Sequence, residues 1–110
     1  MIHAVIFQNK TKECIGFQLE GHAGYAEEGQ DIVCAAISVL VINTINAIEA
    51  YTEDDFSVVS DETEAILSCH FRKKPSHDAA LLLKAMILGL SDMIADENYE
   101  EYIDLTFEEV

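Results

Sequence analysis

A histidine and a cysteine lie within one stretch of the chain, residues 20–34, that holds three of its five glycines. His22 lies near the start of this stretch and Cys34 lies at its end. An imidazole can take the proton of a nearby thiol or stand beside the thiolate as an imidazolium, which is the minimum apparatus of cysteine-dependent peptide hydrolysis. The pair therefore suggests nucleophilic catalysis. A small buried cysteine and an ordinary loop histidine are the alternative interpretation of these two residues.

The position of Cys34 close to a predicted helix start favours the thiolate. Asp31 is a favoured N-cap residue, and with Asp31 as the cap, Cys34 becomes the third residue of the helix. Unpaired backbone N–H groups and the positive end of the helix dipole stabilise an anion there, and the same groups suit an oxyanion hole. Asp31 can instead orient His22, but one carboxylate is unsuited to both tasks, and the cap is favoured.

Gly21 and Ser38 are the supporting candidates. The glycines of residues 21–29 permit large backbone swings, so this segment predicts a lid with Gly21 as a hinge, although an ordinary connection fits equally well. Ser38 lies one helical turn beyond Cys34. Its hydroxyl can bond within the site or to the carbonyl group four residues earlier, and the second arrangement is the commoner one.

The hydrophobic period indicates the elements that must position these residues. Strands are expected where apolar and polar residues alternate, and helices where apolar residues recur at helical spacing. The expected strands are residues 2–8, 14–20, 56–60, 64–71 and 102–107, and the expected helices are residues 31–51 and 79–95, with Pro75 and Ser76 signalling the second helix start. The order ββαββαβ predicts an α+β fold, a largely antiparallel sheet with two helices packed on one face.

Length and charge narrow the class of protein. The chain has 110 residues, half of them hydrophobic, and a formal net charge of −15. This size predicts one domain over residues 1–110, and the apolar content excludes an intrinsically disordered chain. The negative charge repels a phosphate backbone, so we expect no nucleic-acid partner. No apolar run reaches the ~18 residues of a membrane span, so we expect no membrane association.

The remaining cysteines and histidines show no spacing typical of a metal site. Cys14, Cys34 and Cys69 are an odd number and lack the Cys-x-x-Cys pattern, so we expect at least one free thiol, a reducing compartment, and hence the cytoplasm. Cys14 and Cys69 lie in strand patterns where a core cysteine is the default. We expect no metal and no cofactor.

Two short sequence motifs resemble those of a known family. Residues 21–26 read Gly-His-Ala-Gly-Tyr-Ala, and residues 29–36 read Gly-Gln-Asp-Ile-Val-Cys-Ala-Ala, with Ser38 and Leu40 after them. These motifs resemble those of the ribosomal-processing cysteine protease family, called Prp, whose members are also compact ββαββαβ domains of about this length. The resemblance covers nearly the whole chain, and no motif position departs from it.

The resemblance implies an endopeptidase that removes a short N-terminal extension from large-subunit ribosomal protein twenty-seven, a cut needed for ribosome assembly. It implies Cys34 as the nucleophile and His22 as the general base and acid. It also implies a homodimer, a mobile loop between these two residues that orders around the substrate, and a groove that accepts aromatic side chains.

Two other functions remain compatible with the residues alone. An acidic, non-enzymatic assembly factor would use its negative surface to hold a basic ribosomal protein. A thiol redox or thioesterase-like enzyme would use the same cysteine and histidine, although no resolving cysteine lies close in sequence.

Overall fold

The structure is a computed structural model that describes residues 1–21 and 30–110. Its elements follow the order ββαββαβ that the hydrophobic period predicts. They are β1 (Ile2–Gln8), β2 (Cys14–Glu20), α1 (Gln30–Tyr51), β3 (Phe56–Asp61), β4 (Ile66–Phe71), α2 (His77–Ala95) and β5 (Ile103–Glu109).

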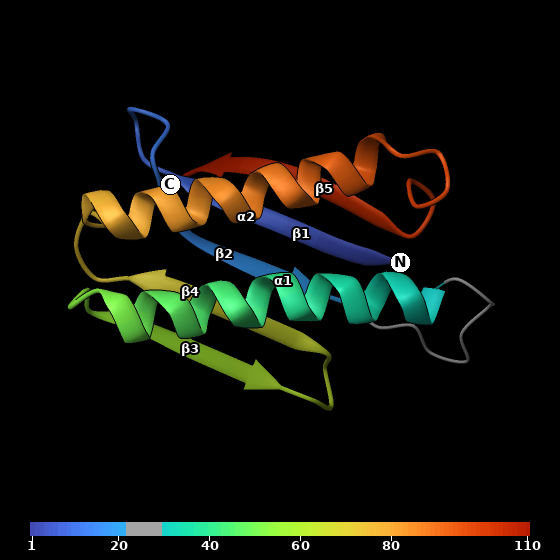
Figure 1. Cartoon of the computed structure of the whole chain (residues 1–110), viewed down its shortest axis with the longest axis horizontal. Coiled ribbons are helices and arrows are strands. Elements are labelled where there is room, and N and C mark those ends of the chain that lie inside the picture. Colours follow the sequence, from blue (N-terminus) through green and yellow to red (C-terminus); the bar gives the residue numbers. More distant parts are fainter. Residues whose placement is uncertain (22–29) are drawn as a thin grey trace.

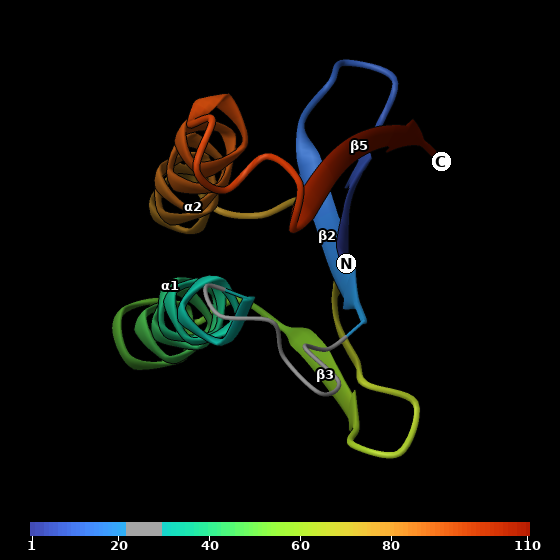
Figure 2. The same ribbon diagram turned by 90° about the vertical axis from the view of Figure 1, so that its right-hand side faces the viewer.

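The described strands form one sheet in the order β3-β4-β2-β1-β5. The pairs β1 with β2, β2 with β4 and β3 with β4 are antiparallel, whereas β1 and β5 run parallel. Both helices cover the same face of this sheet, as Figures 1 and 2 show together. The predicted α+β fold, with a largely antiparallel sheet and two helices on one face, is confirmed.

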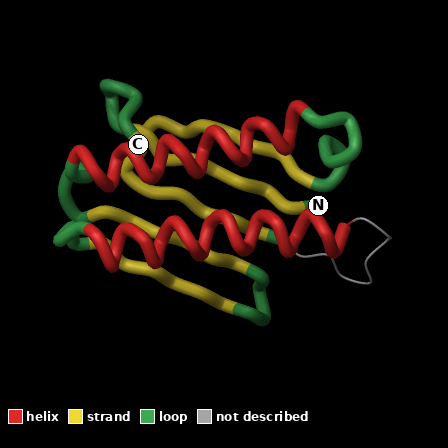
Figure 3. The backbone as a smooth tube through the Cα atoms, viewed as in Figure 1, coloured by secondary structure: helices red, strands yellow, loops and turns green. Residues whose placement is uncertain are grey.

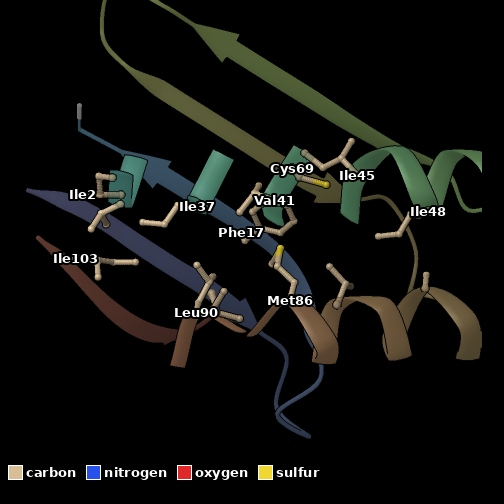
Figure 4. Packing of buried hydrophobic residues seen from close by; sticks show 14 residues of the cluster. Ile2, Phe17, Ile37, Val41, Ile45, Ile48, Cys69, Met86, Leu90 and Ile103 are labelled. Carbon is tan, nitrogen blue, oxygen red and sulfur yellow. The ribbon is translucent and has the colours of Figure 1, made fainter. Parts of the chain in front are cut away.

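The core lies between the sheet and the two helices (Figure 4). Alternate residues of the central strands meet one stripe of each helix, as the two periods require. The cluster includes Ile2, Ile6, Phe17, Cys69 and Ile103 from the sheet, Val33, Ile37, Val41, Ile45 and Ile48 from α1, and Ala79, Leu83, Met86 and Leu90 from α2. The interpretation of Cys69 as a core cysteine is therefore confirmed.

Helix α2 begins where the Pro75 and Ser76 pair predicts. Ser76 is the N-cap, and its hydroxyl oxygen accepts a hydrogen bond from the Ala79 N–H at 3.2 Å. The Asp54 carboxylate accepts the backbone N–H of Ser76 at 2.7 Å and so ties the end of α1 to the start of α2. Hydrogen bonds from Ser76 hold the pKa of Asp54 below its usual value, although burial opposes this shift.

Several predicted boundaries differ from the structure by one or two residues, among them the start of α2 (residue 77 instead of 79) and both ends of β5 (residues 103 and 109 instead of 102 and 107). Two further differences have a clear physical basis. Strand β4 begins at Ile66 instead of residue 64, because Ala65 adopts a left-handed φ of 53° in the preceding turn. Helix α1 begins at Gln30, so Asp31 is its second residue and not its N-cap, and Cys34 is its fifth residue instead of its third. The expectation that Asp31 caps this helix is therefore wrong, because the helical backbone already includes the residue before it.

Among the described residues, one helical stretch is long and apolar enough to cross a membrane. It is Ile32–Tyr51 of α1, with 20 residues and a mean hydropathy of 1.9, although polar residues such as Ser38, Asn43 and Glu49 interrupt its apolar sequence. Burial explains part of its composition, because Val33, Ile37 and Val41 lie in the core, and 33% of this stretch is buried. The buried Thr44 hydroxyl donates to the Leu40 carbonyl oxygen at 2.7 Å, which satisfies it inside the helix.

Two glycines provide a matched test of this packing. A Cβ at Gly16 would stand 2.7 Å from the backbone carbonyl oxygen of Cys69, whereas a Cβ at Gly89 would stand 2.8 Å from the mobile end of the Leu40 side chain. We expect Gly16→Ala to lower the free energy of unfolding by about 1–3 kcal/mol, because β2 and β4 must separate. We expect Gly89→Ala to change it by less than ~1 kcal/mol, because the helix propensity of alanine offsets a shift of Leu40. Urea unfolding measures both, and equal losses would contradict this explanation.

Candidate active site

Gly21 directly follows β2 and has a backbone conformation that only glycine adopts easily. Its φ is +108°, and a Cβ at this position would collide with the carbonyl oxygen of Met1. Its N–H donates to the Ala65 carbonyl oxygen at 3.0 Å. Met1 on one side and Ala65 on the other thus fix the backbone at the point where the chain leaves β2. The hinge role of Gly21 stays a prediction, because the residues that follow it lie outside the described part.

Cys34 lies on α1 at the edge of the core and is half-buried. It lines a cavity of about 270 Å³ together with Gly21 and Ser38. The structure therefore brings three of the five candidate residues to one cavity. His22 lies outside the described residues, and the description of Asp31 is limited to its backbone position within α1.

Ser38 follows Cys34 by one helical turn and is exposed. The Thr44 and Thr52 hydroxyls donate to the carbonyl oxygens four residues earlier, at 2.7 Å in each case. Ser38 forms no such bond with any residue in the described part of the chain, so the commoner arrangement expected for it is wrong. Ser38 lines the same cavity as Cys34.

The cavity combines an apolar wall with an acidic rim. Ile2, Leu19 and Leu67 belong to the wall, while Asp61 at the end of β3 and Glu62 in the β3–β4 turn form the rim. The Asp61 Oδ1 atom accepts the N–H groups of the next turn residues at 2.9 and 3.1 Å, which fixes the turn. The sequence alone does not reveal this rim. Its alternation signals a hairpin, but it does not reveal that the hairpin lies beside Cys34.

The other two thiols are in different surroundings. Burial raises the pKa of Cys69 to about 12, with a smaller contribution from the charge of Cys14, and Cys69 has no exposed surface. Burial also raises the pKa of Cys14. In residues 1–21 and 30–110, no group of three or more His, Cys, Asp and Glu side chains is placed to hold a metal ion. Of the described thiols, Cys34 is the one that meets the cavity of the candidate residues.

Solved structures of similar fold define the class of protein. A Staphylococcus aureus ribosomal processing protease, Prp, in complex with a substrate peptide superposes with a TM-score of 0.90 at 26% identity, covering 98% of this chain and 100% of that one. The same protease with a covalently linked product peptide gives 0.86 at 28% identity. A Streptococcus mutans protein gives 0.87 at 30% identity over 100% of this chain and 99% of that one. These likenesses and the cavity at Cys34 place the chain among the small cysteine peptidases.

The sequence comparisons give the particular family. A model of the cysteine protease Prp family matches residues 1–104. The ribosomal processing cysteine protease Prp of Bacillus subtilis is 30% identical over 112 residues, covering 96% of each chain. Its Staphylococcus aureus counterpart is 29% identical over 97% of this chain and 99% of that one. The chain therefore belongs to the cysteine protease Prp family and is an enzyme of that class, which argues against the non-enzymatic and redox alternatives.

The three cysteines should differ in their reaction with iodoacetamide. At about pH 8, we expect Cys34 to be alkylated first, because it lines an open cavity, while Cys14 reacts more slowly and Cys69 stays unmodified in the folded protein. Peptide mass spectrometry at increasing reaction times measures the order. The denatured chain, in which all three thiols are accessible, is the control. Faster labelling of Cys14 than of Cys34 would contradict the assignment.

Proposed function

We propose that this enzyme removes the N-terminal extension of large-subunit ribosomal protein twenty-seven by nucleophilic catalysis at Cys34. The observation that carries the proposal is the half-buried thiol at the edge of an apolar cavity, near the start of α1. The names of the relatives support the class of substrate, since they are ribosomal processing proteases. The Staphylococcus aureus enzyme, with its covalently linked product peptide, supports a peptide ligand.

The proposed reaction is acyl transfer. The Cys34 Sγ atom attacks the scissile carbonyl carbon as His22 takes the thiol proton, and the developing oxyanion is stabilised by backbone N–H groups. The unpaired N–H groups of α1 belong to its first residues, which directly precede Cys34. His22 then gives the proton to the leaving amine. Water, deprotonated by His22, hydrolyses the thioester and frees the thiol.

The shape of the cavity supports an apolar side chain next to the scissile bond. Its wall contains Ile2, Leu19, Ile37 and Leu67, and its volume is about 270 Å³. An aromatic substrate side chain would exchange water for these apolar groups, which favours its binding. Ser38 borders the same cavity, and in this proposal its hydroxyl bonds with the peptide backbone. Asp31 is available for a supporting role at the start of α1, since the cap position is excluded.

We infer also that the enzyme acts as a homodimer in the cytoplasm. Support for the dimer comes from the outer side of α1, where Ile32 is 63% exposed, Val39 70% and Ile42 49%. Apolar side chains grouped on one helix are typical of surfaces that a second copy covers. The excess negative charge continues to argue against a nucleic-acid partner.

Substitution of the nucleophile is the first test. We expect Cys34→Ala to reduce cleavage of a peptide spanning the extension by about 10³-fold or more, because no other group can form the acyl-enzyme. We expect His22→Ala to reduce kcat by about 10²–10⁴-fold, because the thiol and the leaving amine lose their proton carrier. Mass spectrometry of the products measures both rates. Cys14→Ala is the matched thiol control and should cleave at nearly the original rate, whereas full activity of Cys34→Ala would refute the proposal.

Salt dependence tests whether charge helps to capture the substrate. The enzyme carries a formal charge of −15 and should attract a basic ribosomal protein. Raising the ionic strength from about 0.01 to 0.15 M shortens the Debye length from ~30 to ~8 Å, so we expect KM to rise several-fold with little change in kcat. A peptide of equal length without basic residues is the control and should show a constant KM. A constant KM for the basic peptide as well would show that charge plays no part.

A further inference from the structure

The basic residues gather at one end of this acidic protein. Of the six lysines and arginines in the chain, two lie in the β1–β2 turn, three in the segment between β4 and α2, and one on α2. They are Lys10, Lys12, Arg72, Lys73, Lys74 and Lys84. The β1–β2 turn and the start of α2 lie at the end of the molecule opposite to the start of α1 (Figures 1 and 3). An ion pair of 3.0 Å between Lys74 Nζ and Glu13 Oε2 joins the two basic segments.

A second cavity lies at this basic end. It has a volume of about 390 Å³, within the range of small-molecule sites. Lys12 and Lys84 contribute charged groups to its lining, and Gln8 and Thr11 contribute neutral polar ones. Pro75, Ile87 and Phe107 provide apolar surface. Cys14, at the opposite end of β2 from Gly21, also lines it, so the two cavities are separated by the length of that strand.

The two lysines of this cavity are free to meet an anion. Arg72 pairs with Asp55 at 3.7 Å and Lys74 with Glu13, whereas neither Lys12 nor Lys84 forms an ion pair with any residue the structure describes. Glu13 is the carboxylate of the cavity lining. Its charge is already engaged, because hydrogen bonds from Thr11, Lys74 and Asn9 lower its pKa to about 2.

The backbone at Lys12 adds a second observation. Its φ is +61°, a left-handed conformation that costs energy in most residues and little in glycine or asparagine. The Lys12 N–H donates to the Asn9 carbonyl oxygen at 2.9 Å, which holds the turn in this form. The backbone conformation alone would thus favour glycine or asparagine at this position. Lysine instead supplies a positive charge at the cavity.

We propose that this second cavity binds a small organic anion, with a carboxylate head between Lys12 and Lys84 and an apolar body against Ile87 and Phe107. Two unpaired cations on an otherwise acidic protein attract the head group, and the apolar lining favours burial of the body. The cavity is separate from the one at Cys34, and the inference does not depend on the proposed reaction.

An NMR titration with two probes of equal shape tests this site. Octanoate carries the carboxylate, and octanamide is its neutral counterpart. We expect octanoate to shift amide signals of residues 11–14 and 80–87 and of Phe107, with little change at residues 19–21 and 34–38, and octanamide to bind severalfold more weakly. Shifts at the Cys34 cavity instead, equal binding of the two probes, or no binding of octanoate would each overturn the proposal.

Three variants of the full chain then test the two lysines. We expect Lys84→Gln and Lys12→Asn each to raise the Kd of octanoate by about threefold, as loss of a partly exposed ion pair predicts. Lys73→Gln is the matched control, because Lys73 belongs to the basic end but does not line the cavity. Lys12→Asn should also keep or raise Tm, since asparagine tolerates the left-handed backbone. Unchanged affinity in both cavity variants, or an equal loss in Lys73→Gln, would overturn the assignment.

Discussion

The packing of α1 against the sheet is the interaction on which the rest of the structure depends. One apolar stripe, which includes Val33, Ile37 and Val41, is buried under the sheet and beside α2. Cys34 directly follows the first residue of that stripe, so burial of Val33 and Ile37 fixes both the depth and the rotation of the thiol. The hydrophobic core thus positions the reactive thiol, and close packing of the core keeps that position well defined.

This arrangement explains why a short chain suffices for a peptidase. A cavity needs two walls, and here one is the first part of α1 while the other is formed by β1, β2 and the β3–β4 hairpin. Both walls also serve the core, since Ile2 and Ile37 line the cavity and belong to the buried cluster. Because the same residues stabilise the fold and form the site, no second lobe is required.

Much of the fold follows from local patterns, and the failures are informative. Alternation and helical spacing predict the order of the elements, and Pro75 with Ser76 predicts the start of α2, because these signals depend on neighbouring residues. The sheet order does not follow from them. The placement of Asp61 and Glu62 beside Cys34 depends on β4 pairing with β2, which is a long-range contact. The prediction that Asp31 caps α1 is wrong, because the preceding residue is itself helical. Ser38 does not form the predicted bond to the carbonyl oxygen four residues earlier, and the cavity that it lines is not revealed by local propensity.

The parallel pairing of β5 with β1 joins strands from opposite ends of the chain, with Ile2 opposite Ile103. Such contacts close a long loop, so they form late compared with the hairpins and helices between them. During synthesis, β1 must therefore wait for β5 to leave the ribosome before it gains its second neighbour. Ile2 also forms part of the wall beside Cys34. One wall of the site beside Cys34 thus includes a strand whose second neighbour is synthesised after every other described element.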